Sequence, residues 1–152
     1  MEWPDVTVLS IGLWDMLHIR DVSAYRVELQ RMLGTLAQRR PDGWTEDDTG
    51  RSLWWVGTPS LQNDKLSPKK QPYMSNALAR SYNDAAVEVL ACGQFASADT
   101  SAGHGLPDGV VDLQGLTSNA SAIIPKTTDG IHYADATYDM VAVLVAAAAS
   151  DG

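Results

Sequence analysis

The fold of this chain can be inferred outward from one segment, which reads Val6-Thr7-Val8-Leu9-Ser10-Ile11-Gly12. This segment is rich in β-branched residues, almost continuously apolar, and stops at a glycine. Such a run is typical of a strand that is buried on both faces of a parallel sheet and ends in a tight turn. A strand of this kind needs neighbours on both sides, so we expect Val6–Gly12 to be central or near-central in its sheet.

The rest of the chain alternates between helical and strand patterns. The expected elements are a helix over 21–40 closed by Pro41-Asp42-Gly43, a buried strand over Leu53–Gly57, an aperiodic loop over Thr58–Tyr73, a helix capped by Ser75 and running to about Leu90, a short strand over Gly109–Leu113, a turn over Asp129–Tyr133, and a last helix from Asp135 to about Ala149. Alternation of this kind predicts right-handed βαβ units on a parallel sheet.

These patterns predict an α/β fold of three layers with at least three parallel strands, in which Leu53–Gly57 lies beside Val6–Gly12. Only three strands are visible, and the first begins a few residues after Met1. We therefore expect residues 1–152 to form a single partial domain that lacks the first strands of its sheet. One edge of Val6–Ile11 should then expose apolar surface where those strands would pack.

Composition and charge exclude several classes of function. Eleven basic residues stand against nineteen acidic ones, which gives a net charge of −8. This balance argues against nucleic acid or an anionic membrane as partner, because both require a basic surface. The longest apolar run, 140–149, is about half of what a membrane-spanning helix needs. No signal peptide is visible at the start of the sequence.

The histidines and the cysteine do not form a metal-binding pattern. His18, His104 and His132 are scattered, and the chain contains neither a Cys-x-x-Cys pair nor a His-x-x-x-His pair. With a single cysteine, Cys92, no disulfide can form within the chain. We therefore expect no metal and no cofactor.

The main catalytic candidate is the segment Asp129-Gly130-Ile131-His132. An aspartate three residues before a histidine, with a glycine between them, lets the chain turn back so that the carboxylate meets imidazole Nδ1. That contact selects the tautomer and leaves Nε2 available to accept a proton from a nucleophile. The alternative is a structural capped turn. The position directly before the last helix of a βαβ chain favours the acid–base pair, because sites in parallel sheets lie beyond the carboxyl ends of strands.

A second candidate, Gly12-Leu13-Trp14-Asp15, directly follows the first strand and is expected at the same end of the sheet. Gly12, Trp14 and Asp15 are candidates for lining the site. The structural alternative is a glycine turn, a core tryptophan and an aspartate that caps a helix.

Together with their neighbours, these residues resemble the SGNH, or GDSL-like, hydrolase superfamily, and most closely the lumenal catalytic domain of the sialic-acid O-acetyltransferase family. The resemblance is carried in order by Leu53-Trp54-Trp55-Val56-Gly57-Thr58-Pro59, Lys65-Leu66-Ser67, Met74-Ser75-Asn76, Tyr82-Asn83-Asp84-Ala85-Ala86 and Asp129-Gly130-Ile131-His132-Tyr133. It implies an SGNH-type fold, with Asp129 and His132 as acid and base and Gly12 in the oxyanion hole. It also implies an acetyl donor and a glycan acceptor as partners, and a Golgi or secretory lumen location for full-length members.

The chain departs from this superfamily at two places. The family's nucleophilic serine lies in a Gly-Asp-Ser block after its first strand, and this chain has neither Gly-Asp-Ser nor Gly-x-Ser-x-Gly. Trp14 also stands where the superfamily usually places an asparagine that donates to the oxyanion, although an indole N–H can donate as well. For an active enzyme, the resemblance therefore implies that the nucleophile comes from a missing N-terminal segment of the same fold.

The leading interpretation is the C-terminal part of a serine-type carbohydrate O-acetyltransferase or acetylesterase that works through an acyl-enzyme. Two alternatives remain open. The first is a catalytically inactive α/β binding module whose Asp129–His132 pair is structural, and the second is a truncated product without independent activity. The absence of the serine favours both alternatives for this polypeptide, whereas the ordered resemblance favours acyl-transfer ancestry.

Overall fold

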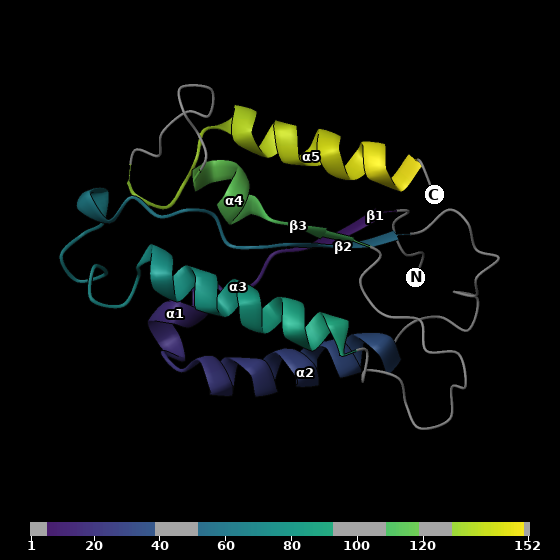
Figure 1. Cartoon of the computed structure of the whole chain (residues 1–152), viewed down its shortest axis with the longest axis horizontal. Helices are drawn as coiled ribbons and strands as arrows, with labels where there is room; N and C mark the ends of the chain where they lie inside the picture. The colour runs from purple at the N-terminus through teal and green to yellow at the C-terminus, as the bar shows by residue number, and fades with distance from the viewer. Residues whose placement is uncertain (1–5, 39–51, 93–108, 119–128, 151–152) are drawn as a thin grey trace.

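The three predicted strands form one parallel sheet in the computed structural model, which describes residues 6–38, 52–92, 109–118 and 129–150 (Figure 1). Strands β1 (Val6–Leu9), β2 (Ser52–Val56) and β3 (Gly109–Val111) lie in the order β1-β2-β3. Val8 pairs with Trp54, and Trp54 pairs with Gly109. The predicted α/β class and parallel sheet are therefore confirmed.

The position predicted for the first strand was wrong for the sheet that the structure describes. β2, rather than β1, lies in the middle, and β1 is at the edge. Each new strand is added on the same side of the previous one, so the first strand remains outermost.

Helices cover both faces of the sheet (Figure 1). Helices α1, α2 and α3 lie on one side and α4 and α5 on the other, which gives three layers. The bounds are α1 Asp15–His18, α2 Val22–Gln38, the 3-10 helix η1 Asn63–Lys65, α3 Asn76–Ala91, α4 Leu113–Ser118 and α5 Asp135–Ser150. In the described residues no helix is both long and apolar enough to span a bilayer.

Alternation along β2 divides the core into two parts. Trp55 packs with residues of α2 and α3 such as Leu33 and Tyr82, whereas Trp54 packs against the cluster that contains Val111 and Val141. Neighbouring residues of a strand point to opposite faces of the sheet. The adjacent tryptophans therefore anchor different helical layers.

Local signals placed the ends of helices α2, α3 and α5 within a residue or two. Asp21 Oδ1 accepts the N–H of Ala24 at the start of α2, and Ser75 caps α3 by accepting the N–H of Leu78. The third strand is shorter than predicted, because Asp112 Oδ1 accepts the N–H of Gly115 and so begins helix α4. Helices α1, η1 and α4 were not predicted, and Pro41-Asp42-Gly43 and His104 lie outside the described residues.

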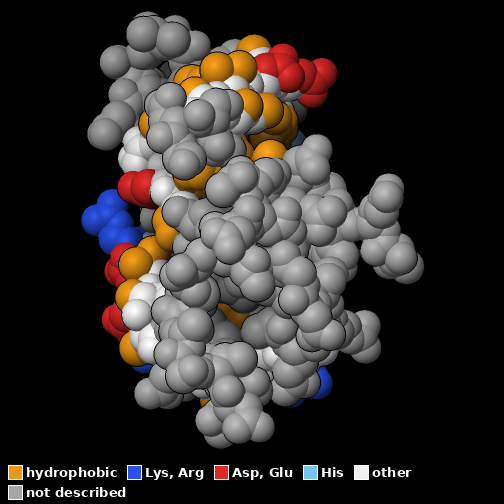
Figure 2. Space-filling model, turned by 90° about the vertical axis from the view of Figure 1, so that its right-hand side faces the viewer, with side chains coloured by type: hydrophobic (Ala, Val, Ile, Leu, Met, Phe, Trp, Pro, Cys, Tyr) orange, Lys and Arg blue, Asp and Glu red, His pale blue; other side chains and the backbone are white. Residues whose placement is uncertain are grey.

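Apolar side chains remain exposed on β1 and α5. Val6 is 41% exposed and Val8 49%, so the first strand exposes apolar surface as predicted, but the prediction that it is buried on both faces was wrong. On α5, Val143 and Leu144 are also exposed. Figure 2 shows hydrophobic side chains gathered at the top of the molecule, where α5 lies.

Candidate functional site

The Asp129–His132 turn is held together by its own aspartate. Asp129 Oδ1 accepts the backbone N–H groups of Ile131 at 2.9 Å and of His132 at 2.8 Å. The other carboxylate oxygen, Oδ2, lies 2.6 Å from His132 Nδ1. One side chain thus closes the turn and contacts the imidazole, at the hydrogen-bonding distance expected from the sequence.

The pair is accessible to a reactant. The side chain of His132 is 62% exposed and that of Asp129 is 46% exposed, while Ile131 between them is buried. A carboxylate on Nδ1 favours the tautomer whose Nε2 is a proton acceptor. Within the described part of the chain, Nε2 has no hydrogen-bond partner, so this arrangement can accept a proton from an approaching hydroxyl.

The turn rests on the segment that follows the central strand. The carbonyl oxygen of Gly130 accepts the N–H of Gln62 at 3.1 Å. Gly130 has a φ of +86°, a conformation that glycine adopts without strain. Residues 57–61 are buried, although the predicted loop showed no periodicity. Figure 1 shows that the chain leading into α5 and helix α1 lie toward the same end of the sheet.

The Gly12 block contacts the same segment at a different residue. Gly12 has a φ of +127°, and a Cβ at this position would lie 3.2 Å from Thr58 Cγ2 and 3.3 Å from the Tyr25 hydroxyl. Thr58 and Gln62 belong to one short stretch, so residues 58–62 connect the Gly12 turn with the Asp129–His132 turn. Both candidate groups therefore lie along the carboxyl ends of β1 and β2, where a site is expected.

Trp14 is not a core tryptophan and Asp15 is not a helix cap, which are the roles that the structural alternative would give them. Trp14 is 48% exposed rather than part of the core, and Lys70 Nζ lies 5.2 Å from the centre of its ring. Asp15 is the first residue of α1, and no side-chain cap is made at the residue before it. Arg20, just beyond α1, has a φ of +58° and stacks on Tyr73 at 3.8 Å. Two cation–aromatic contacts therefore tie the α1 region to the 67–74 region.

Two buried phenols lie beneath the Gly12 turn. Tyr25 donates to the carbonyl oxygen of Ile11 at 3.3 Å, and its ring lies 4.7 Å from that of Tyr82. Burial raises the pKa of Tyr25 above its ordinary value of 10.0, and the nearby Asp15 carboxylate raises this pKa further. Burial and then Asp15 also raise the pKa of Tyr82. Tyr25 therefore supports the turn through its hydroxyl, and Tyr82 packs against the ring of Tyr25.

A curated protein resembles most of this chain. It is Protein ALTERED XYLOGLUCAN 9 of Arabidopsis thaliana. The two are 29% identical over 147 residues, which cover 91% of this chain and 37% of the relative. The chain thus spans little more than a third of that protein's length. No family profile matches the chain, and no solved structure matches it.

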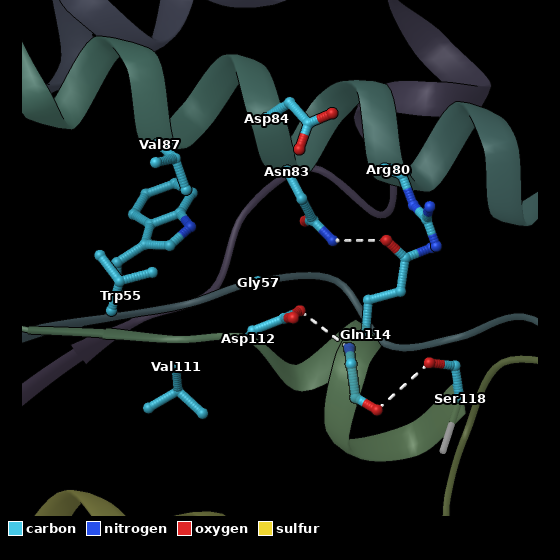
Figure 3. Close-up of a pocket in the computed structure, with 12 residues that line it drawn as sticks. Trp55, Gly57, Arg80, Asn83, Asp84, Val87, Val111, Asp112, Gln114 and Ser118 are labelled. Carbon is cyan, nitrogen blue, oxygen red and sulfur yellow. Dashed lines mark hydrogen bonds between the residues drawn. The ribbon is translucent and has the colours of Figure 1, made fainter. Parts of the chain in front are cut away.

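A cavity of about 290 Å³ lies on the β3 side of the sheet, between α3 and α4 (Figure 3). Arg80, Asn83 and Asp84 line it from α3, and Asp112 and Gln114 line it from the other side. None of the site residues predicted from the sequence lines this cavity. The described residues also contain no group of three side chains suited to holding a metal ion.

The polar side chains that support the 58–62 segment were not predicted as site residues from the sequence. They are Asn76 and Asn83 of α3, Gln114 and Thr117 of α4, and Tyr133 directly after His132. Their only sequence signal was membership, for Asn76, Asn83 and Tyr133, of the stretches that carry the family resemblance. That signal assigns no role to an individual residue.

Proposed function

We propose that this chain supplies the acid–base half of a serine-dependent acyl-ester site of SGNH type, in a carbohydrate O-acetyltransferase or acetylesterase. His132 is the general base and acid, and Asp129 orients it. The backbone at Gly12 belongs to the oxyanion hole, and Trp14 and Asp15 line the site. The nucleophilic serine comes from a segment of the same fold that this chain does not contain.

The observation that carries the proposal is the contact of 2.6 Å between Asp129 Oδ2 and His132 Nδ1. In the reaction, Nε2 of His132 takes the serine proton while the serine oxygen attacks the acetyl carbonyl. His132 then passes that proton to the leaving group, and an acetyl-serine forms. A sugar hydroxyl or water next gives its proton to His132 and takes the acetyl group, and His132 returns that proton to the departing serine oxygen.

The comparison supports a carbohydrate as the acceptor. The relative's name refers to xyloglucan, a polysaccharide, and the similarity extends over 91% of this chain. Neutral sugars present many hydroxyl groups and no charge that requires a basic surface, which suits a chain with a net charge of −8. We therefore propose a glycan hydroxyl and an acetyl donor as the two reactants.

The interactions of the described residues agree with an external nucleophile. No described serine forms a hydrogen bond with His132. Ser60, in the 58–62 segment, donates its hydroxyl to Asn76 Oδ1 at 3.3 Å. A serine brought by another segment would approach the exposed edge of the His132 ring.

Hydrolysis of an activated acetyl ester such as p-nitrophenyl acetate tests the proposal. The 152-residue chain should hydrolyse it no faster than its His132→Ala variant. A longer polypeptide that places a Gly-Asp-Ser block and its strand ahead of this chain should be active. In that polypeptide, His132→Ala should lower kcat/KM at least about a hundredfold, and Asp129→Asn should lower kcat through the wrong tautomer.

His18→Ala is the matched control, because His18 is an exposed histidine of α1 outside the pair. It should change kcat/KM of the longer polypeptide less than twofold. Activity of the 152-residue chain that depends on one of its own serines would refute the external nucleophile. If His132→Ala left kcat/KM of the longer polypeptide unchanged, the Asp129–His132 pair would be structural, as in an inactive binding module.

A further inference from the structure

The segment from Thr58 to Gln62 is held from outside along its whole length. Each of its four backbone N–H groups, at residues 58, 60, 61 and 62, donates to an atom outside the segment, and Pro59 has none to donate. Thr58 and Leu61 are almost fully buried. A buried stretch outside the sheet must find such partners, and here most of them are side chains.

Two asparagines of α3 bind the segment at both ends. Asn83 Oδ1 accepts the N–H of Thr58 at 2.8 Å, and Asn83 Nδ2 donates to the carbonyl oxygen of Thr58 at 3.2 Å. Asn76 repeats this pattern on Leu61, with distances of 2.6 Å and 2.8 Å. Each amide therefore binds one backbone unit through both its oxygen and its nitrogen, as a neighbouring strand would.

Helix α4 secures the middle of the segment and joins the two asparagines. Thr117 Oγ1 accepts the N–H of Ser60 at 2.7 Å. Gln114 Oε1 accepts from Asn83 at 3.3 Å, the contact drawn in Figure 3, and Gln114 Nε2 donates to the carbonyl oxygen of Asn76 at 2.9 Å. Because these amides occupy both donor and acceptor groups, the network holds one arrangement.

The Asp129–His132 turn is attached to this segment on both sides of the histidine. Before it, the carbonyl oxygen of Gly130 accepts from Gln62. After it, the buried Tyr133 donates its hydroxyl to the carbonyl oxygen of Ser60 at 2.7 Å. We propose that Tyr133 is a positioning residue, which couples the 58–62 segment to the backbone of His132 and so fixes the direction of its imidazole.

This inference rests on the proposed acid–base role of His132 and adds the residue that aims it. The ring of His132 is mostly exposed, so packing around the ring does little to restrain it. Its direction depends on the backbone beneath it and on the Asp129 contact. Loss of the Tyr133 hydroxyl should therefore loosen the Asp129–His132 contact while leaving the fold intact.

NMR of the 152-residue chain with 15N-labelled histidine tests this directly. At pH 9 the His132 ring of the original chain should carry its proton mainly on Nδ1, as expected for a ring held by a carboxylate. Tyr133→Phe should lower that Nδ1–H population by at least about a fifth. In the active longer polypeptide, Tyr133→Phe should lower kcat about tenfold and change KM less than twofold.

Three further variants separate positioning from general stability. Tyr73→Phe removes the hydroxyl of an exposed tyrosine whose ring stacks with Arg20, and should leave the His132 tautomer unchanged. Val89→Ala removes core packing in α3, and should lower the melting temperature without moving the tautomer. Thr117→Val removes the acceptor of the Ser60 N–H, and should shift the tautomer as Tyr133→Phe does, but less.

An unchanged His132 tautomer in Tyr133→Phe would overturn the positioning role, and so would an equal shift in Val89→Ala. These readings do not depend on catalysis. An inactive longer polypeptide would count against the proposed function, while the tautomer measurement would still decide whether Tyr133 positions His132.

Discussion

Gly130 allows the backbone between Asp129 and His132 to form a tight turn. A Cβ at this position would lie 2.7 Å from the carbonyl oxygen of Gln62 and 2.9 Å from a methyl carbon of Leu66, and the φ is +86°. Gly130→Ala should therefore lower the free energy of unfolding by at least about 2 kcal/mol, from strain together with displaced backbone. Urea unfolding followed by tryptophan fluorescence measures this loss.

Gly34 is the matched control for this substitution. It lies inside α2, and a Cβ there would meet nothing within 4 Å. Gly34→Ala should raise the free energy of unfolding by about 0.5–1 kcal/mol, because alanine is the better helix former. If Gly130→Ala did not lower the free energy of unfolding, the steric conflict expected for a Cβ at Gly130 would be refuted.

At the scale of elements, helices α2 and α3 meet through Tyr25 and Tyr82, whose rings lie 4.7 Å apart. The pKa of both phenols is raised in the folded chain, burial being the main cause. The unfolded chain therefore releases these protons near the ordinary pKa of 10.0, while the folded chain retains them. Stability should be present below pH 10 and should fall as the pH rises above it.

Urea midpoints at pH 9 and pH 11 measure this loss. The fall between the two pH values should be smaller in Tyr25→Phe than in the original chain, because one raised phenol is gone. In Tyr73→Phe, which changes an exposed tyrosine, the urea midpoint should fall as much as in the original chain. Identical falls in all three proteins would show that the buried phenols do not govern alkaline unfolding.

For the whole molecule, the exposed face of β1 predicts self-association. Val6 and Val8 pair in register with Ser52 and Trp54, so they lie on the α5 side of the sheet, and both are exposed. Replacing both by threonine keeps the β-branched shape and removes apolar surface. The dissociation constant for self-association should rise at least about tenfold, as measured by sedimentation velocity.

Val27→Thr is the control for that surface, since Val27 is 61% exposed on α2, away from β1. It should leave the dissociation constant within about twofold. A chain that stays monomeric at high concentration, before any substitution, would contradict the expectation that this face packs against further polypeptide.

Short-range signals were sufficient for the three strands, for helices α2, α3 and α5, and for the Asp129–His132 contact of the candidate site. The β-branched run after residue 5 forms β1, Ser75 caps α3, and the apolar spacing after Asp21 forms α2. The Asp129–His132 contact joins residues three apart, so the local turn alone brings carboxylate and imidazole together. Interactions between residues three or four positions apart can be recognised from the spacing of those residues in the sequence.

The support of that turn depends on residues far apart along the chain. The bond from Tyr133 to Ser60 joins residues 73 positions apart, and that from Ser60 to Thr117 joins residues 57 apart. Neither bond produces a periodic pattern, so residues 58–61 looked like an open loop although they are buried. The order of the strands in the sheet was not predicted correctly for the same reason. Which strand becomes central depends on where the crossovers carry the chain, because a strand's composition records burial but not its neighbours.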